Sequence, residues 1–401
     1  MTEWKGPFRR RQAADAFDRW KLPMTPEPLL AIDPVEVSIV IPCLNEAATI
    51  GACVDAAIGV LQQHAIAGEV VVADSSTDDS ARVATGHGAR VVRVDLKGYG
   101  NGLMGGIGAA RGRYIVMADA DGQHDFQAIP ELVARLRSGA ELAQGCRLPS
   151  GGGRIMPGAM KWSHRWIGNP MFSLLSRWWY RSPVHDVNCG LRGFTRDLYE
   201  RLDLRCTGME FAAEMILKAS LLRARIVEVP VTVYPDRRVG SRAHLRTFQD
   251  GWRALRFYLL YTPRWLFLMP GLLLWLIGSA GYAMAWSSAA DGEAGGARAL
   301  LVSSACLLCG YQSVIFAIFA KTFAVSERLL PEDPKLSRFY ELVTLEKGLL
   351  FGAASLVAGI ALLAWSGHDL PLGITGATIT ILGFQTMISS FLVSIIGLRR
   401  R

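Results

Sequence analysis

The sequence predicts an α/β head with a mostly parallel sheet, followed by a carboxy-terminal α-helical membrane domain of four spans. Three observations support this fold class. From residue 37 onward, apolar β-branched runs alternate with helical segments, which is typical of βα units in a parallel sheet. Acidic residues directly follow three of these runs. The last third of the chain changes to long apolar stretches that carry almost no charge.

Four strands are expected in the first part of the head, at residues 37–41, 69–72, 90–94 and 114–117. Each is a short run rich in Val, Ile or Tyr, and helical segments separate them. In open parallel sheets, ligands bind beyond the carboxyl ends of the strands. The residues just after each expected strand are therefore the candidates for a binding site.

Acidic and polar side chains gather at three of these strand ends. The residues concerned are Pro42 and Glu46 after the first strand, Asp74 and Asp78 after the second, and Asp119, Asp121 and Gln123 after the fourth. Carboxylates that are packed together repel one another unless a cation or hydrogen-bond donors compensate them. Hard oxygen ligands suit Mg²⁺ or Mn²⁺, which proteins commonly share with substrate phosphates. The pattern predicts a site for a metal and a nucleotide.

A glycine-rich segment offers a competing interpretation. Residues 100–105 read G-x-G-x-x-G, follow an expected strand and open an expected helix, as in dinucleotide-binding proteins. That fingerprint belongs to the first strand–helix turn, whereas this segment follows the third strand. A dinucleotide-binding protein is therefore kept only as an alternative.

With these motifs in place, the chain resembles a family 2 glycosyltransferase of the polyprenyl- or dolichyl-phosphate sugar synthase type. The resemblance rests on six segments within residues 37–250, namely 41–46, 71–78, 119–124 (D-A-D-G-Q-H), 145–147, 186–194 and 208–211. It implies a GT-A-type, Rossmann-like head that binds a nucleotide-diphosphate sugar, of the UDP-glucose or GDP-mannose class. Ala73, Ser75 and Leu44 depart from the family's motifs, so the nucleobase and the sugar stay open.

The resemblance also implies roles for particular residues. Pro42, Glu46, Asp74, Asp78 and Asp119 would contact the nucleotide sugar, and Asp119, Asp121 and Gln123 would hold the metal and the diphosphate. Asp121 and Arg147 would be the catalytic pair, with Arg147 at the acceptor phosphate. Because arginine matches the geometry of phosphate, Arg165 and Arg192 are further candidates for that phosphate.

The expected reaction transfers the sugar to a polyprenyl or dolichyl phosphate with inversion of the anomeric centre. A phosphate monoester is largely dianionic at neutral pH, so it can attack without a strong base. Two alternatives remain. A processive or hydroxyl-directed polysaccharide glycosyltransferase shares the fold. Processive enzymes usually carry a Q-x-x-R-W motif, but the glutamine of that motif is missing before both Arg165-Trp166 and Arg264-Trp265. A non-catalytic membrane scaffold would predict a broken D-x-D motif, and this one is intact.

Four apolar stretches, at residues 265–286, 299–324, 348–365 and 372–398, are each near the length that crosses a bilayer. Basic residues concentrate between the second and third stretches and after the fourth. Positive charge marks the cytoplasmic side, so we expect a multi-pass protein of the cytoplasmic membrane whose head faces the cytosol. The net charge of +8 suits a membrane surface, and we expect membrane lipid and no nucleic acid as a partner.

The expected organisation has four parts. These are a basic leader at 1–34, the catalytic head at 35–244, an interfacial juxtamembrane helix at 245–263 and the membrane domain at 264–401. Phe248, Trp252, Leu255 and Leu259 recur at helical spacing and would form the apolar face of the interfacial helix. Assembly into a homo-oligomer is left open.

Overall fold

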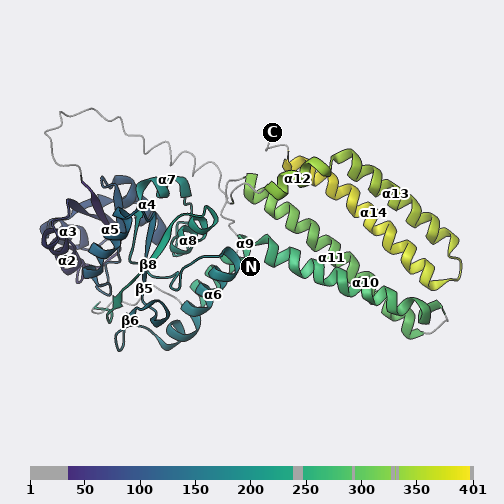
Figure 1. The fold of residues 1–401 in the computed structure, drawn as a ribbon, viewed down its shortest axis with the longest axis horizontal. Coiled ribbons are helices and arrows are strands. Elements are labelled where there is room, and N and C mark those ends of the chain that lie inside the picture. Colours follow the sequence, from purple (N-terminus) through teal and green to yellow (C-terminus); the bar gives the residue numbers. More distant parts are fainter. Residues whose placement is uncertain (1–34, 238–246, 291–293, 327–329, 331–333, 398–401) are drawn as a thin grey trace.

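The computed structural model describes residues 35–237, 247–290, 294–326, 330 and 334–397. Figure 1 shows an α/β head and an elongated bundle of helices, with α6 and α9 on the side of the head that faces the bundle. The expected leader at 1–34 lies outside the described residues.

The head is built on a seven-stranded sheet with the order β3-β2-β1-β4-β7-β5-β8. Its strands are β1 (Val37–Cys43), β2 (Gly68–Asp74), β3 (Arg90–Arg93), β4 (Tyr114–Met117), β5 (Leu142–Cys146), β7 (Arg192–Thr195) and β8 (Ile226–Pro230). All neighbours pair in parallel except β7, which runs antiparallel to both β4 and β5. A second sheet pairs β6 (Arg154–Ile155) with β9 (Thr232–Val233).

Helices cover both faces of the sheet. One face carries α2 (Ile50–Gln63), α3 (Ser80–Gly86) and α5 (Ile129–Arg137), and the other carries α4 (Tyr99–Ala109), α6 (Asn169–Tyr180), α7 (Arg196–Leu202) and α8 (Phe211–Leu221). Alternate residues of β1 serve the two cores, because Ile39 and Ile41 pack on the first face and Val40 packs on the second. Short helical turns complete the head at η1 (Phe126–Ala128), η2 (Pro149–Gly151) and η3 (His164–Gly168).

The carboxyl ends of β2, β1 and β4 meet at one edge of the sheet, because these three strands are adjacent and parallel. Pro42 lies near this edge, beyond the last β1–β4 pair at Val40 and Met117. A proline cannot donate to a sheet ladder, so this position, where pairing with β4 has ended, tolerates it. The acidic segments therefore leave the sheet side by side, as the sequence predicts.

Helix α9 (Thr247–Leu260) connects the head to the bundle. Phe257 and Tyr258 are buried in the core of the head, whereas the side chain of Trp252 is 57% exposed. Helix α9 therefore packs on the head through Phe257 and Tyr258, and Trp252 of the expected interfacial face is exposed. The side chain of Phe248 lies outside the described residues.

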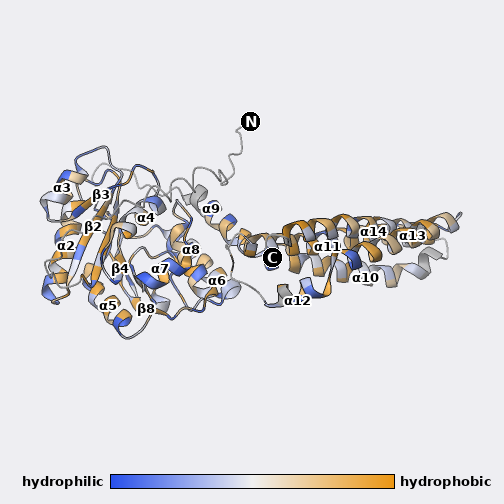
Figure 2. Cartoon of the chain, turned by 90° about the horizontal axis from the view of Figure 1, so that it is seen from above, coloured by the Kyte–Doolittle hydropathy of each residue, from blue (hydrophilic) through white to orange (hydrophobic). Residues whose placement is uncertain are grey.

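The bundle contains α10 (Met269–Ala290), α11 (Ala294–Ser326), α13 (Leu345–Trp365) and α14 (Leu370–Gly397), with η4 (Arg264–Leu268) before it and the short α12 (Pro334–Leu342) beside it. Among the described residues, four helices are long and apolar enough to cross a membrane. Figure 2 shows that hydrophobic residues dominate these helices. Small residues bring the helices close, since a Cβ on Gly352 would lie 2.9 Å from the carbonyl oxygen of Gly383.

Candidate active site

The loops after β1 and β2 are joined by hydrogen bonds into one frame. The backbone N–H of Asn45 donates to Ser76 Oγ (2.8 Å), and that of Glu46 donates to Ser80 Oγ (2.9 Å). In return, the Thr77 N–H donates to Asn45 Oδ1 (2.9 Å). The two strand ends predicted to bind the nucleotide are therefore held at a fixed separation.

The three acidic residues of this frame differ in exposure. Asp74 is fully buried and accepts a charge-assisted hydrogen bond from Arg93 Nη1 at 2.6 Å. Glu46 is 7% exposed. Asp78 is exposed, and although burial acts to raise its pKa, hydrogen bonds from Ser80 outweigh burial and lower it. Asp74 is thus paired with the cation of Arg93, and Asp78 accepts hydrogen bonds from Ser80.

Asp119, the first carboxylate after β4, is held from two sides. Its Oδ1 accepts from the Tyr99 hydroxyl at 2.8 Å, and its Oδ2 lies 2.8 Å from His124 Nε2. Burial acts to raise the pKa of Asp119 and to lower that of His124, but their hydrogen bond and mutual attraction reverse both shifts. The contact therefore favours the charged form of each group, and it fixes the two side chains against each other at the edge of the sheet.

Asp121 and Gln123 form the second half of this strand end. Asp121 Oδ1 accepts from the Gln123 backbone N–H at 3.0 Å, and with the Gln123 amide turned, its nitrogen donates to Asp121 Oδ2 at 3.2 Å. Arg237 lies against the turn between them, since a Cβ on Gly122 would be 3.3 Å from Arg237 Cδ. The basic side chain of Arg237 is exposed.

These oxygen donors fit a magnesium or manganese ion that a substrate shares. Groups of three or more His, Cys, Asp or Glu suited to a metal are absent among the described residues. Mg²⁺ is usually held by one or two carboxylates together with substrate phosphates and water, so a closed protein cage is not required. Asp121 is half-buried and Asp119 keeps further lone pairs on its two oxygens. The donor set is thus compatible with an ion held jointly with a diphosphate.

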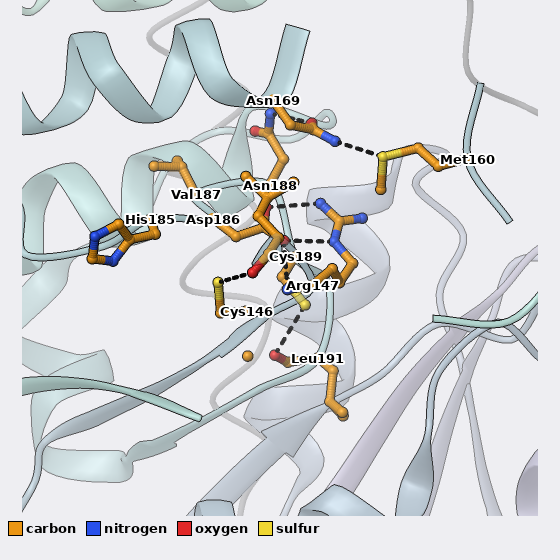
Figure 3. Close-up of polar contacts among 12 residues, drawn as sticks. Cys146, Arg147, Met160, Asn169, His185, Asp186, Val187, Asn188, Cys189 and Leu191 are labelled. Atoms are coloured by element: carbon orange, nitrogen blue, oxygen red, sulfur yellow. Dashed lines mark hydrogen bonds and ion pairs between the residues drawn. The ribbon is translucent and has the colours of Figure 1, made fainter. Parts of the chain in front are cut away.

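Arg147, which follows β5, forms a bidentate ion pair with Asp186 (Figure 3). Its Nε donates to Asp186 Oδ2 at 2.7 Å and its Nη2 donates to Oδ1 at 2.9 Å, while its backbone N–H also donates to Oδ2. The Asp186 side chain has no exposed surface, and that of Arg147 is 14% exposed. Burial acts to raise the pKa of Asp186, but the charge and hydrogen bonds of Arg147 lower it. The guanidinium is therefore fixed in orientation.

Arg192 does not lie where the acceptor role requires, and the structure corrects that prediction. Its side chain is fully buried, and its guanidinium donates to the backbone carbonyls of Ala212, Val187 and Cys189. Arg192 begins β7, which lies between β4 and β5 in the centre of the sheet, so its side chain enters the core. Its contacts fasten the turn at residues 186–190 instead of reaching a ligand.

The turn at residues 186–190 connects the Arg147–Asp186 pair to the Asp119–His124 pair. The Gln144 amide donates to the carbonyls of Asp186 and Cys189 at 3.0 and 3.2 Å, and so holds the turn from β5. At the end of the turn, a Cβ on Gly190 would lie 2.3 Å from Asp119 Oδ2 and 2.9 Å from His124 Nε2. Asp186, which orients Arg147, and Gly190, which approaches the Asp119–His124 pair, are thus four positions apart in one turn.

Arg165 lies on η3, where its guanidinium carbon is 5.3 Å from the ring centroid of Trp166. Burial and the charges of Lys161 and Arg147 lower the pKa of the neighbouring His164. The turn η3 ends beside Asn169, whose Oδ1 accepts from Asn188 Nδ2 at 3.0 Å, so the segment that carries Arg165 adjoins the turn that contains Asp186.

The glycine-rich segment has a packing role. Helix α4 begins at Tyr99, and a Cβ on Gly100 would lie 2.1 Å from the carbonyl oxygen of Cys206, while one on Gly105 would lie 2.6 Å from Val94 Cγ2. These glycines let α4 approach the sheet and the 206–207 loop. Close packing therefore explains the glycines of this segment without a dinucleotide-binding site.

Three residues at the site were not identified from the sequence pattern. Tyr99 reaches Asp119 across 20 positions, Asp186 reaches Arg147 across 39, and Arg237 reaches the Asp121 turn through the β9 connection. No periodic pattern encodes such long-range contacts. Two signals were available, namely the segment 186–194, which begins at Asp186, and the basic residue Arg237 after β9, because a cation beside a cluster of carboxylates is expected to pair with them or with their ligand.

Comparison with known proteins identifies the family. Residues 38–203 match the model of glycosyl transferase family 2, and residues 318–397 match the C-terminal transmembrane region of family 2 glycosyltransferases. The low-salt glycan biosynthesis hexosyltransferase Agl6 of Haloferax volcanii is 38% identical over 374 residues, covering 90% of this chain and 89% of that protein.

Shorter similarities are found with two other proteins. A dolichyl-phosphate hexose transferase of Haloferax volcanii is 27% identical over 184 residues, which cover 46% of this chain and 76% of that protein. The crystal structure of glucosyl-3-phosphoglycerate synthase from Mycobacterium tuberculosis with Mn²⁺, UDP-glucose and phosphoglyceric acid aligns with a TM-score of 0.42 at 22% identity, covering 56% of this chain and 77% of that one.

The expected fold class is confirmed, with a GT-A-type, mostly parallel sheet in the head and four apolar helices after it. The similarity to Agl6 extends over almost the whole of both proteins. This chain therefore belongs to glycosyltransferase family 2, and it is a membrane-bound glycosyltransferase.

Proposed function

We propose that this enzyme transfers a hexose from a nucleotide-diphosphate sugar to a polyprenyl or dolichyl phosphate, with inversion of the anomeric centre and with a divalent metal ion. The observation that carries the proposal is the fixed guanidinium of Arg147 beside the acidic edge of the sheet. Its partner Asp186 and the residue touching Asp119, Gly190, belong to one turn. A cation held there suits a phosphate acceptor that the carboxylates would otherwise repel.

The names of the relatives support the same class of reaction. Agl6 is named a hexosyltransferase, and the shorter relative is named a dolichyl-phosphate hexose transferase. A membrane domain also suits a lipid acceptor, because the acceptor phosphate would lie at the bilayer surface.

The chemistry requires no strong base. A non-bridging oxygen of the acceptor phosphate attacks the anomeric carbon, the bond from that carbon to the donor diphosphate breaks, and the electron pair leaves with the nucleoside diphosphate. The acceptor is largely dianionic at neutral pH, so no proton has to be removed. One displacement from the opposite face of the sugar inverts the anomeric centre.

We assign the donor side of the site to the acidic strand ends. Pro42, Glu46, Asp74 and Asp78 would line the nucleotide, and Asp119, Asp121 and Gln123 would face the diphosphate. Asp121, with Gln123, is the first candidate for a metal ligand, because Tyr99 and His124 already engage both oxygens of Asp119. A bound Mg²⁺ or Mn²⁺ would offset the charge that develops on the departing diphosphate.

We assign the acceptor side to Arg147, with Arg165 as its neighbour. The bidentate pair with Asp186 uses Nε and Nη2 of Arg147, which leaves the remaining donors of the guanidinium fork for a phosphate oxygen. Arg165 lies on the adjacent turn η3 and could contact the same phosphate.

The product distinguishes this proposal from a hydroxyl-directed polysaccharide glycosyltransferase. The purified enzyme in lipid nanodiscs is incubated with a panel of nucleotide sugars, a short polyprenyl phosphate and Mn²⁺. We expect mass spectrometry to find a polyprenyl-phosphate hexose and NMR to find inverted anomeric configuration. A sugar joined to an oligosaccharide hydroxyl, or a product that retains the donor's configuration, would contradict the proposal.

We also propose that the head faces the cytosol from the cytoplasmic membrane. The connection between α11 and α13 contains Arg328, Lys335 and Arg338, Lys347 lies in the first turn of α13, and three arginines end the chain. The connections at 291–293 and 366–369 contain no Lys or Arg. The positive-inside rule then puts the head and both basic segments on the cytosolic side.

A further inference from the structure

One side of η3 and α6 presents a row of large apolar side chains outside the protein core. We call this the α6 apolar face, and it consists of Trp166, Ile167, Leu174 and Trp178 together with Trp162, which lies two residues before η3; each is more than half exposed. Ile167, Leu174 and Trp178 recur seven and four residues apart, so they lie along one stripe of the helix. The opposite side of α6 packs into the head through Phe172, Ser176 and Tyr180.

Single exposed apolar residues are ordinary on protein surfaces, but several large ones gathered on one short helical segment indicate an interaction site. Three of its five members are tryptophans, which membrane proteins concentrate at the boundary between headgroups and acyl chains. Exposed basic side chains, Lys161, Arg177 and Arg181, lie beside the row. An apolar stripe rich in tryptophan and bordered by cations is the composition of a helix that lies on an anionic bilayer surface.

The α6 apolar face is continuous with the membrane domain. The ring centroid of Trp178 is 4.4 Å from that of Trp265, which lies at the start of the apolar segment Arg264–Trp286. The Tyr180 hydroxyl donates to the carbonyl oxygen of Tyr258 in α9 at 2.7 Å. Figures 1 and 2 both show α6 at the end of the head that adjoins the bundle. Helix α6 is therefore fixed beside the point where the first span begins.

We propose that the α6 apolar face lies in the headgroup–acyl boundary of the bilayer that α10 enters, so that the catalytic head contacts the membrane through α6 as well as through its linker. The amino-terminal half of α6 is joined to the turn that orients Arg147. Asn188 Nδ2 donates to Asn169 Oδ1 at 3.0 Å, and the Val187 N–H donates to Ser173 Oγ at 3.3 Å. Docking of α6 would thus hold Arg147 at a constant height above the bilayer. The contact itself does not depend on which acceptor the enzyme uses.

The proposal is tested with nitroxide labels on the full-length enzyme in nanodiscs of phosphatidylcholine and phosphatidylglycerol. Single labels replace Leu174 on the face and, as a control, Gln62, an exposed residue of α2 at the far end of the head. Cys306 and Cys309 are changed to serine to limit background labelling. Collision with oxygen and with a water-soluble nickel chelate then reports on the surroundings of each label.

We expect the label at position 174 to collide about fivefold less often with the nickel chelate than the label at position 62, and more often with oxygen, because interfacial helices sink into the acyl boundary. Equal nickel accessibility at the two positions would show that the face is in water and would overturn the proposal. Protection from both nickel and oxygen would show a protein cover, such as a second copy of this chain, and would also overturn it. A Trp178→Cys label gives the same comparison if the variant at 174 does not fold.

Discussion

At the scale of single residues, the two carboxylates of the D-x-D motif have different surroundings. Asp119 is held by Tyr99 and His124 on both of its oxygens, so its position is set before any ligand arrives. Asp121 is positioned by Gln123, through the backbone and, after rotation of the amide, the side chain. Asp121 is therefore better suited to adjust to an incoming ion, while Asp119 and His124 define the wall of the site.

We predict that Asp121→Ala abolishes turnover and metal-dependent binding of the nucleotide sugar. The folded structure should persist because Asp121 is half-buried and belongs to a loop. Removal of metal with EDTA should likewise stop the wild-type enzyme, and Mn²⁺ should restore it, whereas excess Mn²⁺ should not restore the variant. The control is Asp55→Asn, which changes an exposed carboxylate on α2. Near-normal activity of the Asp121 variant in excess Mn²⁺ would refute the assignment.

The Arg147–Asp186 pair combines a functional and a structural role, which complicates the simple variant. Asp186 has no exposed surface, so Arg147→Ala leaves a carboxylate buried without its counter-ion. Removing one partner of a buried pair commonly costs about 3–5 kcal/mol of stability. Loss of activity in that variant alone could therefore reflect unfolding.

A double variant separates the two roles. We predict that Arg147→Ala lowers use of the lipid phosphate by about 10-fold or more, since a lost charge-assisted contact costs roughly 1.5–3 kcal/mol. Arg147→Ala/Asp186→Asn should recover part of the lost melting temperature without recovering acceptor use. Binding of the nucleotide sugar should change little in either variant. If the double variant regains both stability and acceptor use, Arg147 is a structural residue only.

At the scale of elements, the sequence predicts well those strands that are marked by a local pattern of residues. The ends of β1, β2 and β4 follow from short apolar runs closed by acidic residues, and their parallel pairing follows from the helices between them. The insertion of β7 between β4 and β5 could not be predicted from local patterns. Strand β7 pairs with β4, which lies about 80 positions earlier in the chain, and with β5, which lies about 50 positions earlier. The prediction for Arg192 is wrong for this reason, because an arginine at the start of a short segment resembles a surface cation, whereas its side chain is fully buried.

The α6 element shows a second limit of the sequence. Its tryptophans and leucines follow a helical period, yet the period alone does not tell a buried face from one that meets lipid. In the structure, Phe172 and Tyr180 of α6 fill the core, whereas Leu174 and Trp178 are exposed.

We predict that Gly190→Ala disables the enzyme while leaving it folded. The new Cβ would lie 2.3 Å from Asp119 Oδ2, too close for any contact, so the Asp119–His124 pair must move. The matched control is Gly108→Ala in α4, where a Cβ would meet nothing within 4 Å and where alanine should stabilise the helix by roughly 0.5–1 kcal/mol. Turnover and melting temperature are measured for both. Normal turnover in the Gly190 variant would show that the turn does not constrain the site.

At the scale of the whole molecule, the enzyme combines a water-exposed catalytic head with helices that expose apolar side chains along their length. The side chains of Leu276, Leu350 and Trp365 are 69%, 73% and 83% exposed, which is unfavourable in water and favourable in lipid. Helices α13 and α14 approach closely through glycines, and α11 contacts α14 through the Tyr311–Thr386 hydrogen bond of 2.7 Å. The bundle is therefore a specific structure as well as an anchor.

Our last prediction concerns the orientation of this bundle. Cysteines are introduced singly at Gly295, His368 and Pro334 in cells that express a Cys306→Ser/Cys309→Ser variant, and a membrane-impermeant maleimide is added from outside. His368 is chosen over Gly367 because that glycine has a φ of +50°, which disfavours a cysteine. All three positions are exposed in the structure. An even number of spans with the basic connection inside requires labelling at 295 and 368 and none at 334. Permeabilised cells, in which position 334 should react, provide the control for its accessibility. Labelling of position 334 in intact cells would place the connection between α11 and α13 outside, and the catalytic head with it, which would contradict the cytosolic orientation.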